Sequence, residues 1–91
     1  MNGVEVTRVT GDERADYVFA VEMMDGHAYT VMLSEEYYMR LTSGKITPEK
    51  LVELSFDFLL RHEGPDSIMS EFELPTIQKY FVDYEDAIMS L

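Results

Sequence analysis

The stretch from Thr47 to Gly64 carries start and stop signals for a helix together with an apolar face. Thr47 can cap the helix, Pro48 is favoured in its first turn, and Gly64-Pro65 ends it. The spacing i, i+3, i+4, i+7 that marks one face of a helix is met by Leu51, Leu54, Ser55, Phe58, Leu59 and His62. A helix with one such face needs a second layer of structure to cover it.

The first third of the chain is rich in Val, Thr, Tyr and Phe and predicts three strands, over residues 4–9, 17–24 and 27–33. Asp25-Gly26 is a strong signal for a two-residue hairpin turn. Such a turn pairs Met24 with His27 and Val18 with Leu33. It assigns to the core the face that carries Phe19, Val21, Met23, Ala28, Thr30 and Met32, and leaves Glu22, His27, Tyr29, Val31 and Leu33 on the wetter face.

The remainder is predicted to be helical. Ser34 can cap a short helix that points Tyr38 and Leu41 inward and ends near Gly44. Asp66 or Ser67 can begin a further turn of helix that runs through Phe72. Helical spacing resumes after Pro75, as one bent helix or as two pieces, with Ile77, Tyr80, Phe81, Tyr84 and Ile88. We therefore expect one α+β domain over residues 1–91, with a three-stranded antiparallel sheet (1–33) followed by three to five helices (34–91) packed on one face.

Charge restricts the partners that this chain can have. It holds 18 acidic and 7 basic residues, a formal net charge of −11, whereas binding to nucleic acid needs a basic surface. There is no cysteine, so disulfides and thiolate metal sites are excluded. No apolar run approaches the length of about 18 residues that predicts a membrane span, and the first residues lack the pattern of a signal peptide. We expect a cytoplasmic protein that binds neither membranes nor nucleic acid.

No catalytic motif stands out in the sequence. The five glycines occur singly, so there is no glycine-rich phosphate loop, and no serine lies in a nucleophile elbow. We therefore expect no cofactor and no enzymatic activity. The alternative is a metal- or small-molecule-dependent enzyme that uses His27 or His62 with nearby carboxylates such as Glu22 or Glu63. That alternative requires both histidines to converge in one cleft.

The aromatic residues of the helical half suggest either a core or an interface. Tyr37 and Tyr38 are adjacent, so Tyr37 should be partly exposed if Tyr38 is buried. Exposed tyrosines and methionines are typical of protein interfaces. Our leading hypothesis is a non-catalytic interaction or regulatory domain whose partner is a basic protein or a second copy of this chain. A second copy could bind at an open sheet edge or at the face that carries Tyr29, Val31 and Leu33.

The two halves of the chain differ in charge. Residues 1–45 hold four basic and eight acidic residues, and residues 46–91 hold three basic and ten acidic, which gives −4 and −7. Acidic surface steers a protein toward basic partners. We therefore place the candidate partner-binding surface on the helical half, and assign to it Tyr37, Glu71, Glu73, Tyr80, Asp83, Tyr84, Glu85 and Asp86.

Residues 34–86 also contain a recognisable pattern. The runs Ser55-Phe56-Asp57-Phe58-Leu59-Leu60 and Leu74-Pro75-Thr76-Ile77-Gln78-Lys79-Tyr80-Phe81, followed by Tyr84-Glu85, carry it. The chain resembles a group of small bacterial proteins of similar length that end in an SFxFLL…LPxIxxYFxxYE pattern and have no assigned activity. The resemblance implies a bacterial cytoplasmic origin and a self-contained fold.

Overall fold

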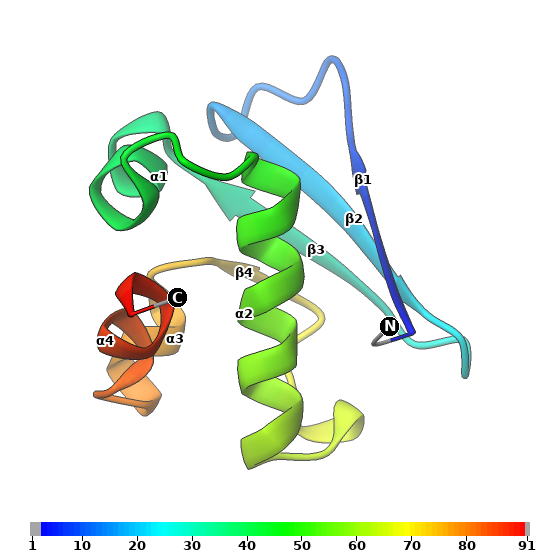
Figure 1. The fold of residues 1–91 in the computed structure, drawn as a ribbon. Helices are drawn as coiled ribbons and strands as arrows, with labels where there is room; N and C mark the ends of the chain where they lie inside the picture. The colour runs from blue at the N-terminus through cyan, green and yellow to red at the C-terminus, as the bar shows by residue number, and fades with distance from the viewer. Residues whose placement is uncertain (1–2, 91) are drawn as a thin grey trace.

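The computed structural model describes residues 3–90 and has an α+β fold, in which the helix over residues 48–62 lies across one face of a sheet and the other helices gather beside it (Figure 1). The predicted ranges 1–33 and 34–91 also include residues 1, 2 and 91, which lie outside the described part. The elements in chain order are β1 (Val4–Arg8), β2 (Tyr17–Met23), β3 (Ala28–Leu33), α1 (Glu35–Thr42), α2 (Pro48–His62), the 3₁₀ turn η1 (Pro65–Ser67), β4 (Glu71–Glu73), α3 (Thr76–Tyr80) and α4 (Tyr84–Met89).

Helix α2 begins and ends where the sequence predicts. The Thr47 side chain accepts a hydrogen bond from the backbone N–H of Lys50 at 3.1 Å, and Pro48 occupies the first turn. The buried face of the helix is wider than predicted, because it also includes Val52 and Phe56. His62, which was predicted to lie on this face, is exposed. The helix is broadly buried because it contacts β1 as well as α1 and α4.

Within residues 3–90 the sheet has four strands in the order β1-β2-β3-β4, one more than expected. The first three pair antiparallel, and β4 pairs parallel to β3, with Phe72 opposite Val31. The prediction of helix through Phe72 is therefore wrong. The chain between β3 and β4 contains α1 and α2, and a helical crossover of this kind is what allows two strands of one sheet to run parallel.

The β2–β3 hairpin has a three-residue loop and not the predicted two-residue turn. The backbone N–H of Met23 bonds to the carbonyl of His27 at 2.8 Å, and Gly26 takes a φ of +97°. Such loops use a glycine in the left-handed region to close the strands. The register moves by one residue, and a slip of one residue exchanges the two faces of a strand. Tyr29, Val31 and Leu33, which were assigned to the wetter face, are therefore buried in the core.

Of the remaining helical segments, α1 starts where the sequence predicts, whereas the turn predicted to begin at Asp66 or Ser67 is η1, which begins at Pro65 and ends at Ser67. Ser34 caps α1 through a 3.1 Å hydrogen bond from the N–H of Tyr37. Tyr38 is buried as predicted, but Tyr37, which was expected to be partly exposed, is buried as well. The helix ends before Gly44, because Ser43 already adopts a left-handed φ of +53°. After Pro75 the chain forms two separate helices, α3 and α4.

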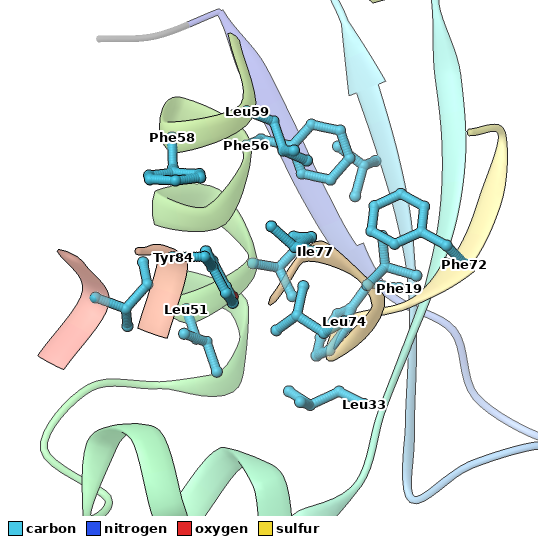
Figure 2. Close-up of a cluster of buried hydrophobic side chains, with 14 of the residues drawn as sticks. Phe19, Leu33, Leu51, Phe56, Phe58, Leu59, Phe72, Leu74, Ile77 and Tyr84 are labelled. Carbon is cyan, nitrogen blue, oxygen red and sulfur yellow. The ribbon is translucent and has the colours of Figure 1, made fainter. Parts of the chain in front are cut away.

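The core lies between α2 and the sheet and draws on both halves of the chain. Figure 2 shows Phe19 and Leu33 from the sheet facing Leu51 and Phe56 from α2, with Tyr84 of α4 closing one side. Phe72 of β4 reaches the same layer, where its ring centroid is 6.1 Å from that of Phe56. Across residues 3–90, no helix has both the length and the apolar character needed to cross a bilayer.

Candidate interaction surface

Two of the predicted partner-binding residues belong to the interior. Tyr84 is 0% exposed, its hydroxyl lies 2.6 Å from that of Ser55, and burial raises its pKa well above the usual range for tyrosine. Tyr37 is buried, and its hydroxyl donates to the Glu85 carboxylate at 2.9 Å. Burial, followed by that hydrogen bond, raises the pKa of Tyr37. Neither ring is open to a partner in the folded domain.

The other predicted residues are distributed over several elements. The Glu85 carboxylate accepts a 3.0 Å hydrogen bond from the guanidinium of Arg40, so this acid is already paired within the chain. Asp83 and Asp86 are exposed at the start of α4. Tyr80 lies on α3 and is 69% exposed, which makes it the most exposed tyrosine or phenylalanine among residues 3–90. The structure therefore does not unite the predicted set into one patch.

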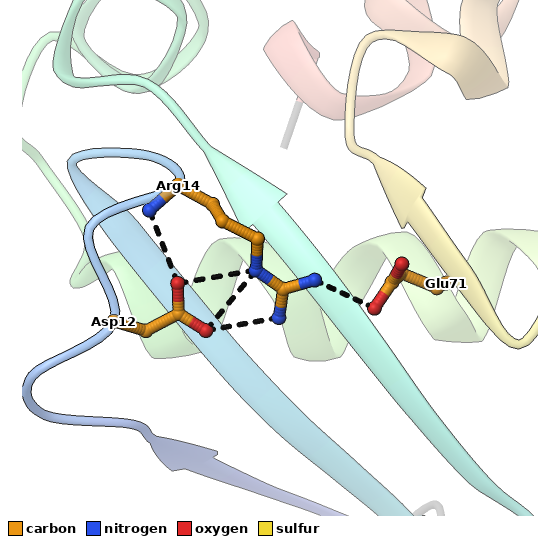
Figure 3. A network of polar contacts seen from close by, with 3 residues as sticks. All are labelled: Asp12, Arg14 and Glu71. Carbon is orange, nitrogen blue, oxygen red and sulfur yellow. Dashed lines mark hydrogen bonds and ion pairs between the residues drawn. The ribbon is translucent and has the colours of Figure 1, made fainter.

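Glu71 and Glu73 lie on β4 and project from the face of the sheet that α2 leaves uncovered. Phe72 between them points into the core, and successive side chains of a strand alternate between its faces. Arg14, from the β1–β2 loop, reaches across β3 to the Glu71 carboxylate at 2.7 Å (Figure 3). The same guanidinium bonds to Asp12 and thereby lowers the pKa of that carboxyl group.

The uncovered face carries further acids. Val6 and Val21 pair and pack toward the core, so Glu5 and Glu22, one residue away, are directed to the uncovered face and lie directly opposite each other. Like charges in directly opposed positions destabilise a sheet. Ala20 and Thr30, which are opposed to each other on β2 and β3, are small. The uncovered face therefore carries acidic side chains beside small ones.

Strand β4 also leaves backbone groups unpaired. Its hydrogen bonds to β3 include Thr30 N–H to Ser70 O at 2.7 Å and Leu74 N–H to Met32 O at 2.9 Å. Alternate residues of a parallel strand bond to the same neighbour, so Ser70, Phe72 and Leu74 face β3. The N–H and C=O groups of Glu71 and Glu73 therefore point to the other edge, where the described chain places no strand.

An apolar groove lies between the end of α2, β4 and α3. Its volume is about 490 Å³, and seven of its ten lining side chains are apolar. Met69 and Tyr80 are exposed at this groove, and Glu63 is the charged residue among the lining side chains. The lining consists of Leu59, Glu63, Ser67, Ile68, Met69, Phe72, Thr76, Ile77, Tyr80 and Phe81.

The two histidines have separate surroundings. His27 follows the hairpin loop, with its Nε2 2.6 Å from Asp66 and its Nδ1 2.8 Å from Asp25. The hydrogen bond to Asp66, followed by that to Asp25, raises the pKa of His27. The His62 ring is exposed and packs on Phe81, with 5.2 Å between the ring centroids.

Within the described chain, no group of three or more histidine and carboxylate side chains is arranged to hold a metal ion. The histidines do not share a polar cluster, and no observation on these residues favours the alternative hypothesis of an enzyme built on His27 or His62.

The sequence-based prediction included Glu71, Glu73 and Tyr80 but not the strand and the groove that relate them. The signal for the strand was present, because Glu71-Phe72-Glu73 alternates polar, apolar, polar. Three residues are too few for this alternation to be distinguished from the exposed side of a helical turn. Arg14 gave no signal, because its contact with Glu71 joins segments 57 positions apart.

Comparisons with models of protein families, with curated proteins and with solved structures found no match to this chain. The resemblance of its C-terminal half to small bacterial proteins therefore stays a hypothesis. Any function has to be argued from the surface itself.

Proposed function

We propose that this chain is a non-catalytic interaction domain that binds a basic protein partner through the surface around β4. This surface consists of the apolar groove, the side chains of Glu71 and Glu73, and the free edge of the strand. The observation that carries the proposal is the groove, which leaves seven apolar side chains lining an opening beside a strand that bears two glutamates.

The composition of this surface resembles that of a protein interface. Interfaces combine an apolar centre with a polar rim, and tyrosine and methionine are enriched in their centres. Tyr80 is 69% exposed and Met69 is 45% exposed, and both line the groove. Large apolar side chains gathered on one part of a small domain's surface indicate a binding site more often than isolated ones do.

The negative net charge of the chain favours a basic protein as the partner over a second copy of the chain. Two copies of a chain with a net charge of −11 repel each other, whereas a basic protein is attracted over a distance of about a Debye length, roughly 8 Å at physiological salt. The outward carboxylates of Glu71 and Glu73 supply negative charge on the other side of the same strand. Glu71 shares the guanidinium of Arg14 with Asp12, so these two acids and one arginine still carry one net negative charge. A basic partner with an apolar anchor satisfies both features of the surface.

The test compares two pairs of charge-neutralising substitutions in the full chain. A basic protein is first captured from a bacterial lysate at low salt and purified. Its affinity for the chain is then measured at several salt concentrations. We expect the double variant Glu71→Gln/Glu73→Gln to bind more weakly, with a shallower dependence on salt. The matched control Asp83→Asn/Asp86→Asn removes the same charge from α4 and should leave affinity nearly unchanged beyond the loss of general steering.

A larger loss of affinity in the Asp83→Asn/Asp86→Asn variant would indicate a binding surface on α4 and contradict the proposal. Failure to capture any basic protein would also contradict it. Circular dichroism of both variants checks that the fold is retained. The substitutions themselves should cost little stability, because the Arg14–Glu71 ion pair is about half exposed and exposed ion pairs contribute little to stability.

A further inference from the structure

We infer that the partner binds as an extended segment that adds a fifth strand to the sheet beside β4, with basic residues alternating with apolar ones. This inference rests on the proposed function and specifies its binding mode. Addition of a strand to an open sheet edge is a recurrent way of recognising peptides, in which backbone hydrogen bonds give affinity and alternate side chains give specificity.

The backbone of β4 has hydrogen-bonding groups that point to the free edge of the sheet. Because Ser70 and Leu74 bond to β3, the N–H and C=O groups of Glu71 and Glu73 face the free edge. An incoming strand therefore finds two residues that each offer one donor and one acceptor. The neighbouring residues Met69 and Ser70 are exposed, so the approach to the edge is open on that side.

The side chains of β4 determine the sequence that fits. Phe72 lines the apolar groove on the inner side of the strand, whereas Glu71 and Glu73 project on the outer side. Successive side chains of an added strand alternate in the same way, and directly opposed side chains come within about 5 Å. One set of the incoming side chains thus enters the groove, and the other set lies beside the two glutamates.

Charge complementarity favours a basic segment over a second copy of this chain. Two β4 edges placed side by side would bring the glutamates of one copy near those of the other, which is unfavourable. Charged side chains on an edge strand are a known means of preventing such self-pairing. Arg14 of the chain itself already bonds to Glu71 at 2.7 Å, so the exposed Glu73 carboxylate is the position on the outer side of β4 at which we place a basic side chain of the partner.

The test uses synthetic peptides as probes and the unmodified chain. The parent peptide alternates Arg and Leu. Two derivatives carry N-methyl groups, one on every Arg and the other on every Leu, and a scrambled peptide keeps the composition without the alternation. In an added strand only one of the two residue sets directs its N–H groups at β4. We therefore expect one methylated peptide to lose at least about tenfold in affinity and the other to bind like the parent.

Fluorescence anisotropy gives the affinities, and NMR amide shifts at Glu71 and Glu73 locate the bound peptide. Equal binding by both methylated peptides, or equal weakening of both, would overturn strand addition. If the two methylated peptides behave alike and the scrambled peptide binds as well as the parent, the chain still recognises basic segments. Only strand addition is then rejected. If no cationic peptide binds, the proposed function fails with it.

A protein variant gives a second test. Glu73→Pro removes the N–H group of residue 73, which faces the free edge. It leaves the hydrogen bonds between β4 and β3 intact, and prolines are tolerated at such edge positions. Glu73→Gln removes the charge alone. We expect the proline variant to bind the parent peptide at least about threefold more weakly than the glutamine variant. Equal affinities would contradict the role of the edge.

Discussion

The hydroxyl groups of Tyr84 and Ser55 lie 2.6 Å apart, and both side chains are fully buried. Ser55 donates its proton to the carbonyl of Leu51 at 2.8 Å, so Tyr84 is the donor in the contact between the two hydroxyls. The contact joins α4 to the middle of α2. It gives a buried tyrosine the partner that its hydroxyl requires in an apolar interior.

Removing this hydroxyl should weaken the domain. Because Ser55 keeps its bond to Leu51, Tyr84→Phe leaves no orphaned donor and should lower the free energy of unfolding by about 1 kcal/mol. Tyr84→Ala also removes the ring and should cost roughly 3–5 kcal/mol. Urea denaturation measures both values. Tyr80→Phe is the matched control, because the Tyr80 side chain is exposed, and it should change nothing. A neutral Tyr84→Phe variant would show that the buried contact contributes nothing.

Repulsion between the directly opposed Glu5 and Glu22 should destabilise the sheet. Replacing one member by lysine turns a repulsive cross-strand pair into an attractive one, so Glu22→Lys should raise the free energy of unfolding by about 0.5–1 kcal/mol. Glu13→Lys makes the same charge change in the exposed β1–β2 loop and corrects for the lower net charge. Denaturation at low and high salt gives the difference between the two variants. That difference should shrink at high salt, and its absence at low salt would contradict the prediction.

The raised pKa of His27 makes stability depend on pH. A group whose pKa is higher in the folded than in the unfolded chain stabilises the fold while it is protonated in both states. The contribution is complete below the unfolded pKa of about 6.5 and is lost as pH rises through the higher folded value. The free energy of unfolding should therefore fall as pH increases across this window.

His27→Gln should remove that part of the pH dependence, and Asp66→Asn should reduce it, because Asp66 gives the largest contribution to the shift. Denaturation curves recorded at a series of pH values test both variants. His62 is retained in each and serves as the internal reference. An unchanged pH profile in the His27→Gln variant would show that the ion pairs around the hairpin loop do not contribute to stability.

The hairpin loop depends on glycine at one position. Gly26 has a φ of +97°, which is unfavourable for other residues, although no atom lies within 4 Å of the place where a β-carbon would stand. Gly26→Ala should therefore destabilise the domain by about 1–2 kcal/mol through backbone strain alone. Gly64 has equal space but an ordinary φ of −77°. Gly64→Ala should be neutral or slightly stabilising, and equal thermal stabilities of the two variants would refute the argument.

The strongest local signals in the sequence predicted structure correctly. Helix α2 was foreseen because Thr47 and Pro48 start it, Gly64-Pro65 stops it, and its apolar face repeats over four turns. Caps and periodicity act over a few residues, so they can be recognised without knowledge of the fold. For the candidate site, Glu71, Glu73 and Tyr80 stay predictions made from charge and residue type, whereas Tyr37 and Tyr84 are buried.

By itself, the sequence determined the α+β class, the three N-terminal strands, the capped helices and the acidic character of the surface, because each depends on neighbouring residues or on composition. Only the tertiary structure decided the hairpin register and the place of β4. The observed loop is one residue longer than the predicted turn. Because neighbouring residues of a strand point to opposite faces, this difference places Tyr29 in the core and not on the wetter face. The pairing of β4 with β3 follows a crossover of nearly forty residues, and its stability comes from contacts that no local pattern encodes.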